Sequence, residues 1–372
     1  MKYFGCKFRI YPNAEQIEYL ETNFNAARFV YNHLLDLRKT AYEKDEKIGD
    51  WELSREIAKM KKQEEYAWLK KAYSIALISS VHDLIKAYKL FFKKMQKYPR
   101  FKSRFYKQSF RIHQNFAFSS LGKGYAYLKL PKLKSCIKMK IHRAVKADVK
   151  SIIVSREPSG KYYVSLNCQC KLTNNNSTKQ EHEKRSAGVH LSIDPLVTTS
   201  DGYVYGAPKY YHKSMKRLKF LSRALSRKEK GSGKFEKQRK RIARLSEKIK
   251  NRRRDYLHKV SCQLVKNYDI LYIKDLDART LTQDRCNKSG RKAADASLGE
   301  LIRQLQYKAL WNHKELRKLL NKIEIHKYNS GIDIAKAILE IGQGMPEFKP
   351  VEIVTKVLSF KRKSKASVKR ER

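Results

Sequence analysis

The stretch 187–205, AGVHLSIDPLVTTSDGYVY, decides the fold of the second half of the chain. Apolar residues alternate with polar ones in three short runs of it, and a turn at Asp201-Gly202 separates the last two, which predicts short β-strands. Beyond it, further strands alternate with helices, an order typical of an α/β domain. The strands are expected at Val189–Ile193, Leu196–Thr199, Tyr203–Tyr205, Ile270–Ile273 and Ile323–Ile325, and the helices at Ser297–Leu320 and Ile332–Ile341.

The first half of the chain has a strand pattern and a helix pattern. Residues 2–10 and 125–170 alternate as strands do, with a hairpin turn at Pro158-Ser-Gly160, whereas apolar residues between them recur every three or four positions. These patterns predict an α+β multidomain fold. The expected parts are a small β-barrel at 1–13 and 98–173, a helical domain at 14–97, a polar linker at 174–186, an α/β domain at 187–350 with a basic helical hairpin at 210–266, and a basic tail at 351–372.

The charge of the chain points to a polyanionic partner. Its 372 residues include 84 Lys and Arg but only 36 Asp and Glu, a formal net charge of +48. Such an excess strains a compact fold by self-repulsion unless a polyanion neutralises it, and nucleic acid is the polyanion that fits best. No apolar run approaches the ~20 residues of a spanning helix, so a membrane partner is not expected. The start, Met1–Arg9, lacks the apolar core of a signal peptide, which predicts a cytoplasmic, nucleoid-associated protein.

The six cysteines predict no metal site. They contain no C-x-x-C pair, and a zinc site needs four ligands at short recurring spacings. Reduced structural thiols are expected instead.

Cations and aromatic residues interleave between Tyr98 and Arg111, a segment that we call the basic–aromatic strip. Cations pair with phosphates and aromatic faces stack on bases, so the strip predicts contact with RNA. The alternative is a basic loop whose aromatic side chains pack inward. The cations are Arg100, Lys102, Arg104, Lys107 and Arg111, and the aromatic residues are Tyr98, Phe101, Phe105, Tyr106 and Phe110.

An ordered set of short motifs resembles the TnpB family of transposon-encoded RNA-guided nucleases. The motifs are Arg9-Ile-Tyr-Pro-Asn13, Ala27-Arg-Phe-Val-Tyr-Asn32, Tyr98-Pro-Arg-Phe101, Leu130-Pro-Lys-Leu133, Arg254-Asp-Tyr-Leu-His-Lys259, Ala296-Ser-Leu-Gly-Glu300 and Gly344-Met-Pro-Glu-Phe348. The resemblance implies a helical recognition lobe, a wedge β-barrel and an RNase H-like, RuvC-type α/β domain. It also implies a guide RNA, a double-stranded DNA target and recognition of a short motif that flanks the target.

The resemblance also implies an acidic nuclease site, and here the sequence departs from the family. RuvC-type cleavage needs carboxylates that hold two divalent ions ~3.5–4 Å apart. The family's G-x-D-x-G strand reads Gly188-Val-His-Leu-Ser192 here, which places His190 at the first acid. Its E-D-L pattern begins with Lys274, and its D-R-D-x-N-A-A pattern places Gly331 at the last acid. The family's zinc ribbon before that last motif is missing.

Three nearby acids fail on geometry as replacements. Asp194 lies four residues, or ~13 Å, along a strand from His190. Asp275 points to the face of the sheet opposite Lys274. Asp333 is ~200° around a helix from Gly331.

These departures predict an inactivated nuclease site, with no catalytic residues, no required metal and no enzyme activity. We therefore expect a TnpB-like repressor of the group often called TldR, with one chain per guide RNA. It would pair the guide with one strand of the DNA and block transcription by occupying a promoter. The alternatives are an active endonuclease with rearranged acids, an RNA-binding transposition accessory that never opens DNA, and the product of a decayed gene.

The resemblance places four residues near the flanking motif of the target: Trp51, Ser74, Ile75 and Ile78. The last three share one helical face by spacing, and an apolar Ile suits the thymine methyl group in the major groove. A T-containing motif is therefore expected. The alternative is that Ile75 and Ile78 belong to the core of the helical bundle.

Overall fold

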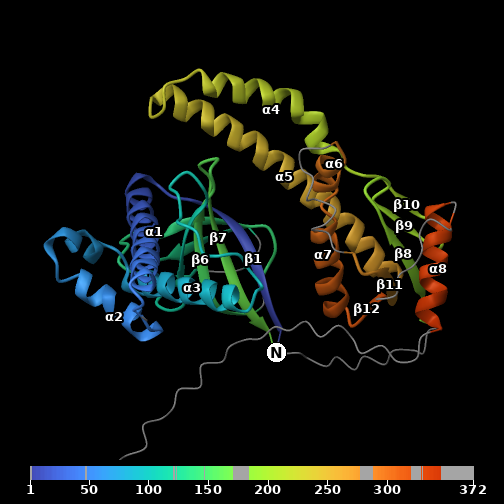
Figure 1. The fold of residues 1–372 in the computed structure, drawn as a ribbon, viewed down its shortest axis with the longest axis horizontal. Coiled ribbons are helices and arrows are strands. Elements are labelled where there is room, and N and C mark those ends of the chain that lie inside the picture. The colour runs from blue at the N-terminus through green and yellow to red at the C-terminus, as the bar shows by residue number, and fades with distance from the viewer. Residues whose placement is uncertain are drawn as a thin grey trace, which may run out of the picture. The chain divides into compact units, whose positions relative to one another are not determined.

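The computed structural model describes residues 2–344 except 47, 120–121, 123, 146, 171–183, 277–287, 320–327 and 329. The chain forms two compact units (Figure 1). Unit 1 comprises Met1–Ser177 and Phe220–Glu247, and unit 2 comprises Thr178–Lys219 and Lys248–Arg372. The expected strand at 323–325, the tail at 351–372 and most of the linker at 174–186 lie outside the described residues.

A seven-stranded antiparallel sheet forms the centre of unit 1, in the order β2-β6-β7-β1-β5-β4-β3. The strands are β1 (Lys2–Tyr11), β2 (Gln108–Ile112), β3 (Ala117–Phe118), β4 (Gly124–Lys129), β5 (Ile137–Ile141), β6 (Asp148–Arg156) and β7 (Tyr162–Cys170). Phe110 of β2 and Leu128 of β4 share one buried core with Phe8 of β1, so the sheet curls around its apolar face. This is the barrel-like sheet that the alternation predicts, although no pairing between β2 and β3 is seen among the described residues.

Helices of unit 1 pack beside this sheet. They are α1 (Ala14–Glu43), α2 (Asp50–Met60), a 3-10 helix (Glu64–Lys71) and α3 (Ser74–Phe92). The side chain of Asn13 accepts a hydrogen bond from Gln16 N and thereby caps α1, because the first N–H groups of a helix lack partners of their own. Leu20 and Phe24 of α1 join the core of the sheet, whereas Val30 and Leu34 join the core of the helical bundle. The helical lobe and the curled sheet therefore share α1.

Unit 2 has a five-stranded mixed sheet in the order β10-β9-β8-β11-β12. The strands are β8 (Ser186–Leu191), β9 (Val197–Thr199), β10 (Val204–Tyr205), β11 (Ile270–Lys274) and β12 (Glu315–Leu319). The first three pair antiparallel, and β11 pairs parallel to both β8 and β12. The helices that follow in the chain are α4 (Tyr210–Ser226), α5 (Gly233–Asn267), α6 (Lys288–Ala296), α7 (Leu298–Trp311) and α8 (Gly331–Gln343). The end of α4 and the first part of α5, within Phe220–Glu247, belong to unit 1, and the rest belongs to unit 2.

The expected helix at Ser297–Leu320 is wrong in its last part. Helix α7 ends at Trp311, and His313 turns the chain out of the helix with a φ of 53°. The following residues form β12, in which Leu316 pairs with Leu271 and Leu319 with Lys274 of β11. The spacing of three between Leu316 and Leu319 imitates a helix, but pairing with a distant strand decides the conformation. None of the described helices is long and apolar enough to cross a membrane.

Candidate nucleic-acid interface and the His190 group

Three neighbouring strands of unit 2 bring His190, Thr198 and Lys274 side by side. His190 of β8 lies directly opposite Thr198 of β9 in the antiparallel register. Val189 pairs with Ile273 on the other side, so Lys274 follows on β11 beside His190. Because directly paired residues point to the same face of a sheet, the three side chains share one face.

Helix α8 packs on this face and adds Gly331, its first residue. The approach is close at Gly188, where an added Cβ atom would lie 1.9 Å from the carbonyl oxygen of Ala335. A Cβ atom added at Gly331 would lie 3.2 Å from Thr198 Oγ1 and 3.6 Å from His190 Cδ2. The fold thus brings together His190, Lys274 and Gly331, the three positions that the motifs single out. We call these three residues and Thr198 the His190 group.

The chemistry of the His190 group does not fit two divalent ions. Burial, and next the ammonium of Lys274, lower the pKa of His190 below its usual range, so the imidazole is neutral at physiological pH. Thr198 is 2% exposed, and its hydroxyl has no hydrogen-bond partner in the described part of the chain. The group offers an imidazole, a hydroxyl and an ammonium, but no carboxylate to hold hard cations.

The three acids considered as replacements are each bonded to a neighbour. Asp194 Oδ2 lies 2.6 Å from Lys209 Nζ, and Asp275 Oδ1 accepts from Lys318 Nζ at 3.2 Å. Asp333 Oδ2 accepts from the hydroxyl of Ser330 at 2.7 Å. Across the described ranges, no three His, Cys, Asp or Glu side chains cluster in a way that suits a metal ion.

Most of the basic–aromatic strip is open to solvent in unit 1. Tyr98, Phe101, Phe105 and Tyr106 are exposed, so the inward-packing alternative holds only for Phe110, which is buried under the sheet. The four exposed cations are Arg100, Lys102, Arg104 and Lys107, whereas Arg111 is partly buried and pairs with Asp83.

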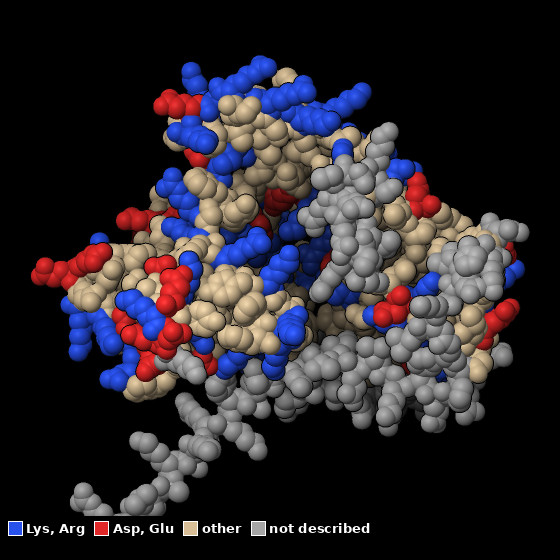
Figure 2. Space-filling view, in the orientation of Figure 1, with Lys and Arg blue, Asp and Glu red and all other residues tan. Residues whose placement is uncertain are grey.

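Two contacts fix the conformation of the strip. The side chain of Asn32 accepts from Lys102 N at 2.7 Å and donates to Lys102 O at 3.0 Å. The guanidinium of Arg239 on α5 lies 5.3 Å from the ring centroid of Phe105. Lys and Arg side chains also gather along α4, at the top of Figure 2. The strip is therefore an ordered, exposed surface with cations around it. Binding of phosphates and stacking on bases need such a surface.

Of the residues expected to read a flanking motif, Ser74, Ile75 and Ile78 lie in the first turns of α3. Trp51 lies at the start of α2, where its neighbour Asp50 pairs with Lys89 in the last turn of α3. Trp51 is 67% exposed, and the guanidinium of Arg55 lies 4.3 Å from its ring centroid. Ser74 is exposed and accepts from Lys61 Nζ at 2.9 Å. Ile78 is 40% exposed, whereas Ile75 packs partly against the core of the sheet. The core alternative thus fails for Ile78 and holds in part for Ile75.

A basic pocket between α5 and α7 in unit 2 was not predicted from the sequence. It encloses roughly 390 Å³, and its polar lining consists of Lys250, Arg253, Arg254, Ser297, Glu300 and Arg303. The spacings of three and four within each helix put these residues on single helix faces. That spacing was the available signal, but nothing in it shows that the two helices pack together.

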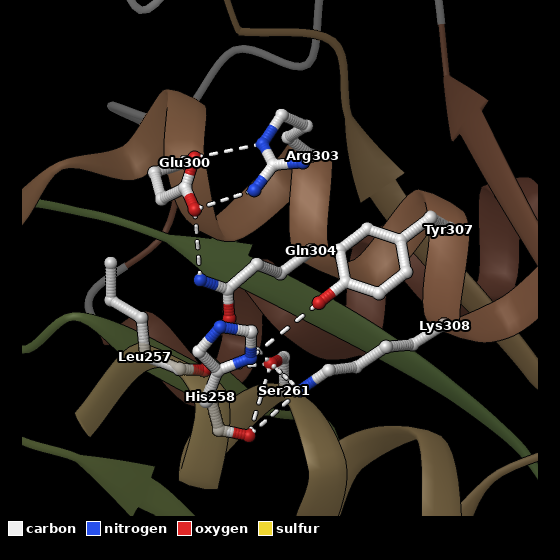
Figure 3. A network of polar contacts seen from close by, with 8 residues as sticks. All are labelled: Leu257, His258, Ser261, Glu300, Arg303, Gln304, Tyr307 and Lys308. Carbon is white, nitrogen blue, oxygen red and sulfur yellow. Dashed lines mark hydrogen bonds and ion pairs between the residues drawn. The ribbon is translucent and has the colours of Figure 1, made fainter. Parts of the chain in front are cut away.

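A buried polar network supports the α7 wall of this pocket (Figure 3). Gln304 donates to Glu300 Oε1 at 3.1 Å, and its own side-chain oxygen accepts from the hydroxyl of Ser261 at 3.0 Å. The ammonium of Lys308 donates to that hydroxyl at 2.6 Å and to the carbonyl oxygen of His258 at 2.8 Å. Each buried polar group has a partner, so the network holds α5 and α7 in a definite register.

Two family models match parts of the chain. Residues 167–285 match the model described as "Probable transposase", and residues 1–47 match one described as "Helix-turn-helix domain". Within 1–47 the structure has the strand β1 and the single long helix α1.

Two relatives cover most of the chain and carry the name "Putative RNA-guided DNA endonuclease". The one from Streptomyces pristinaespiralis is 34% identical over 313 residues, which are 83% of this chain and 75% of the relative. The other, InsQ of Escherichia coli strain K12, is 34% identical over 319 residues, 82% of this chain and 77% of the relative. Among solved structures, the chain is similar in fold to the protein of a Cas12f1–sgRNA–target DNA complex, with a TM-score of 0.52, 10% identity and coverage of 91% and 80%.

These relatives correct one expectation from the sequence. Both are named as endonucleases, which contradicts the expectation that the chain is not an enzyme. They agree with the resemblance that the ordered motifs indicate. Because the similarity extends over at least three quarters of each relative, the chain belongs to the TnpB family.

Proposed function

We propose that one chain carries one guide RNA, pairs it with the complementary strand of a DNA duplex and represses transcription by occupying that duplex. Base pairing would read the target sequence, and the protein would read only a short flanking motif through Trp51, Ser74 and Ile78. The names of the relatives and the formal net charge of +48 support guide RNA and duplex DNA as partners. The proposal places the chain on chromosomal DNA.

The composition of the His190 group carries the occupancy part of the proposal. Guide-directed binding rests on basic surfaces and base pairing, so it needs no divalent ion at this group. The ammonium of Lys274 stands beside a neutral imidazole, and a cation there repels a second cation. The same charge attracts the phosphates of a bound strand.

RNA-guided DNA cleavage is the second candidate function, and the names of both relatives favour it. A chain that cuts by the two-metal route needs carboxylates other than the His190 group, because this group has none. The two candidates therefore differ in what happens to the DNA after it is bound.

The test uses the purified full chain with its copurifying RNA, which is sequenced to define the target. A labelled duplex that matches the guide is incubated with the complex in Mg²⁺ or Mn²⁺, and a scrambled duplex is the control. We expect a guide-dependent shift on a native gel and an intact duplex on a denaturing gel. Fragments that depend on both guide and metal would contradict the occupancy proposal and support cleavage. If no duplex shifts, both candidates are wrong and the RNA-binding accessory function is favoured.

A reporter assay tests repression separately. The target is placed over a promoter or downstream of the transcribed gene, with the same guide and chain. Repression is expected only in the first arrangement, because a bound complex there excludes polymerase. Equal expression from both reporters would contradict the proposed role of occupancy.

A further inference from the structure

The pocket between α5 and α7 has more positive charge than its own acids neutralise. Arg253 pairs with Asp295 at 3.1 Å, and Arg303 forms a two-pronged pair with Glu300 at 2.8 and 2.7 Å. Lys250 and Arg254 line the same pocket, and neither has an ion-pair partner within the described residues. These two cations are four residues apart on α5 and so lie on one face of the helix. The pocket has four cations, and two acids pair with Arg253 and Arg303, so a surplus of two positive charges remains for an anion.

Glu300 gives the pocket a hydrogen-bond acceptor in addition to its positive charge. The guanidinium of Arg303 above all, together with the amide of Gln304, lowers the pKa of Glu300 to about 2, so its carboxylate stays ionised and can only accept hydrogen bonds. Oε1 accepts from Arg303 and Gln304, whereas Oε2 accepts, among the residues that the structure describes, only from Arg303. A carboxylate has about four acceptor positions, so Oε2 keeps one for a ligand. A phosphate alone cannot use it, because an ionised phosphodiester has no donor.

We propose that this pocket binds one ribonucleotide of the guide RNA, with its phosphate on Lys250 and Arg254 and its ribose 2′-hydroxyl donating to Glu300. The identity of the RNA as a guide rests on the proposed function, whereas the chemistry of the pocket does not. The 2′-hydroxyl is the donor that distinguishes RNA from DNA, and it lies within one sugar of the phosphate. Leu257 adds an apolar wall, and the volume lies within the ~300–1,000 Å³ of ordinary ligand pockets.

The wall that carries Glu300 is already in place before any ligand arrives. Gln304 fixes the carboxylate from below, and Gln304 is fixed by Ser261 and Lys308 (Figure 3). Arg253 is held by Ser297 Oγ at 3.1 Å and by the carbonyl oxygen of Ala294 at 3.2 Å. Such fixed partners lower the ordering cost of binding.

The test compares two labelled probes that differ only in the 2′-hydroxyl, an oligouridylate and an oligodeoxyuridylate of equal length. The full chain, freed of copurified RNA in high salt, is titrated with each probe over a series of KCl concentrations, and binding is followed by fluorescence anisotropy. The wild-type chain should bind the ribo probe more tightly. The double variant of K250A and R254A should flatten the salt slope for both probes by ~0.7, the value for the one phosphate that the two cations share, which means ~2.6-fold less change in affinity over a fourfold change of salt. K250A and R254A alone should each flatten it by part of that.

Glu300 is tested by the ratio of the two affinities. Both probes carry the same phosphates, so this ratio is insensitive to the charge that E300A frees on Arg303. E300A should bring the ratio of ribo to deoxy affinity towards one. E300Q keeps the side-chain shape and should lower the ratio part of the way, because a neutral acceptor forms a weaker bond than a carboxylate. Thermal melting of each variant confirms that it is folded.

Arg252 provides the matched control. It is exposed on α5 next to Arg253 but does not line the pocket, so R252A should leave the ratio unchanged and the salt slope steeper than in K250A and R254A. Equal slopes in R252A, K250A and R254A, or an unchanged ratio in both Glu300 variants, would overturn the pocket proposal. Guide-dependent binding of duplex DNA by the wild-type chain is measured in parallel. Its loss would contradict the proposed function, whereas the probe data would still decide the pocket.

Discussion

Replacing Gly188 with alanine should push α8 off the sheet that carries the His190 group. The added Cβ atom would lie 1.9 Å from Ala335 O and 2.7 Å from Leu339 N, and both are backbone atoms of α8. No side-chain rotation relieves such an overlap, so the helix has to move by about 1 Å in an interior that is close-packed. Ile334 and Ile338 of α8, which share a buried cluster with Tyr272 of the sheet, then lose contact with it.

The expected loss of stability in Gly188→Ala lies at the upper end of the ~1–3 kcal/mol that overpacking a core typically produces. A loss of ~3 kcal/mol confined to α8 speeds local opening by roughly a hundredfold, because each ~1.4 kcal/mol is a factor of ten. Hydrogen exchange followed by mass spectrometry over residues 331–343 measures this directly in the full chain. The wild-type and variant chains are compared at the same pH and temperature.

Gly5 gives the matched control, because it is also a strand glycine and nothing lies within 4 Å of an added Cβ atom there. Gly5→Ala should leave α8 exchange unchanged, and it should stabilise unit 1 by ~0.4–1 kcal/mol by restricting the unfolded chain. If α8 of Gly188→Ala exchanges as slowly as that of the wild type, α8 does not pack on β8 as described. The close approach of Gly331 to His190 would then be wrong as well.

The other predictions concern binding, pH and metals. Replacing all five cations of the basic–aromatic strip with alanine should lower the RNA that copurifies and flatten the salt dependence of binding by ~0.7 for each lost phosphate contact; equal RNA yield removes the strip from the interface. Ile78→Gln should change the flanking-motif preference in a selection from a randomised library, and an unchanged T preference contradicts its role. The pKa of His190 is lowered in the folded chain, so the unfolded chain takes up its proton first and stability falls as the pH drops below ~6.5. His190→Gln should reduce this loss in urea titrations between pH 7.5 and 5.5, and a pH-independent difference from wild type refutes it. A variant with His190→Asp, Lys274→Glu and Gly331→Asp should gain a Mn²⁺-dependent rise in melting temperature that the wild type lacks, worth ~2.7 kcal/mol at a hundred times the dissociation constant.

Local periodicity was enough to predict most elements from the sequence. The stripes through Phe24, Val30 and Leu34 identify α1, and the alternation around Val189 identifies β8, because each pattern repeats within one segment. Strand β12 was missed for the opposite reason. Its conformation depends on pairing with β11, more than forty residues away, and no local signal records that pairing.

The candidate site, too, could be predicted from the sequence only in part. The motifs identify His190, Lys274 and Gly331 one at a time, but only the register of β8, β9 and β11 shows that Thr198 completes the group. The pocket between α5 and α7 was out of reach, because Lys250 and Glu300 are fifty residues apart in the sequence and meet only through packing of the two helices.

The fold of unit 2 depends on small residues and not on the acids that the family places beside them. Gly188 admits the backbone of α8, and Gly342 admits the ring of Tyr272, whose nearest atom would lie 2.1 Å from an added Cβ atom. Carboxylates clustered on this face would repel one another in a partly buried setting unless bound cations compensated them. A neutral imidazole, one ammonium and a bare glycine avoid that cost, so the scaffold can keep its packing without metal ions at this group. The basic–aromatic strip and the pocket are built from other elements, so a change of chemistry at His190 leaves intact the surfaces that we propose to bind RNA.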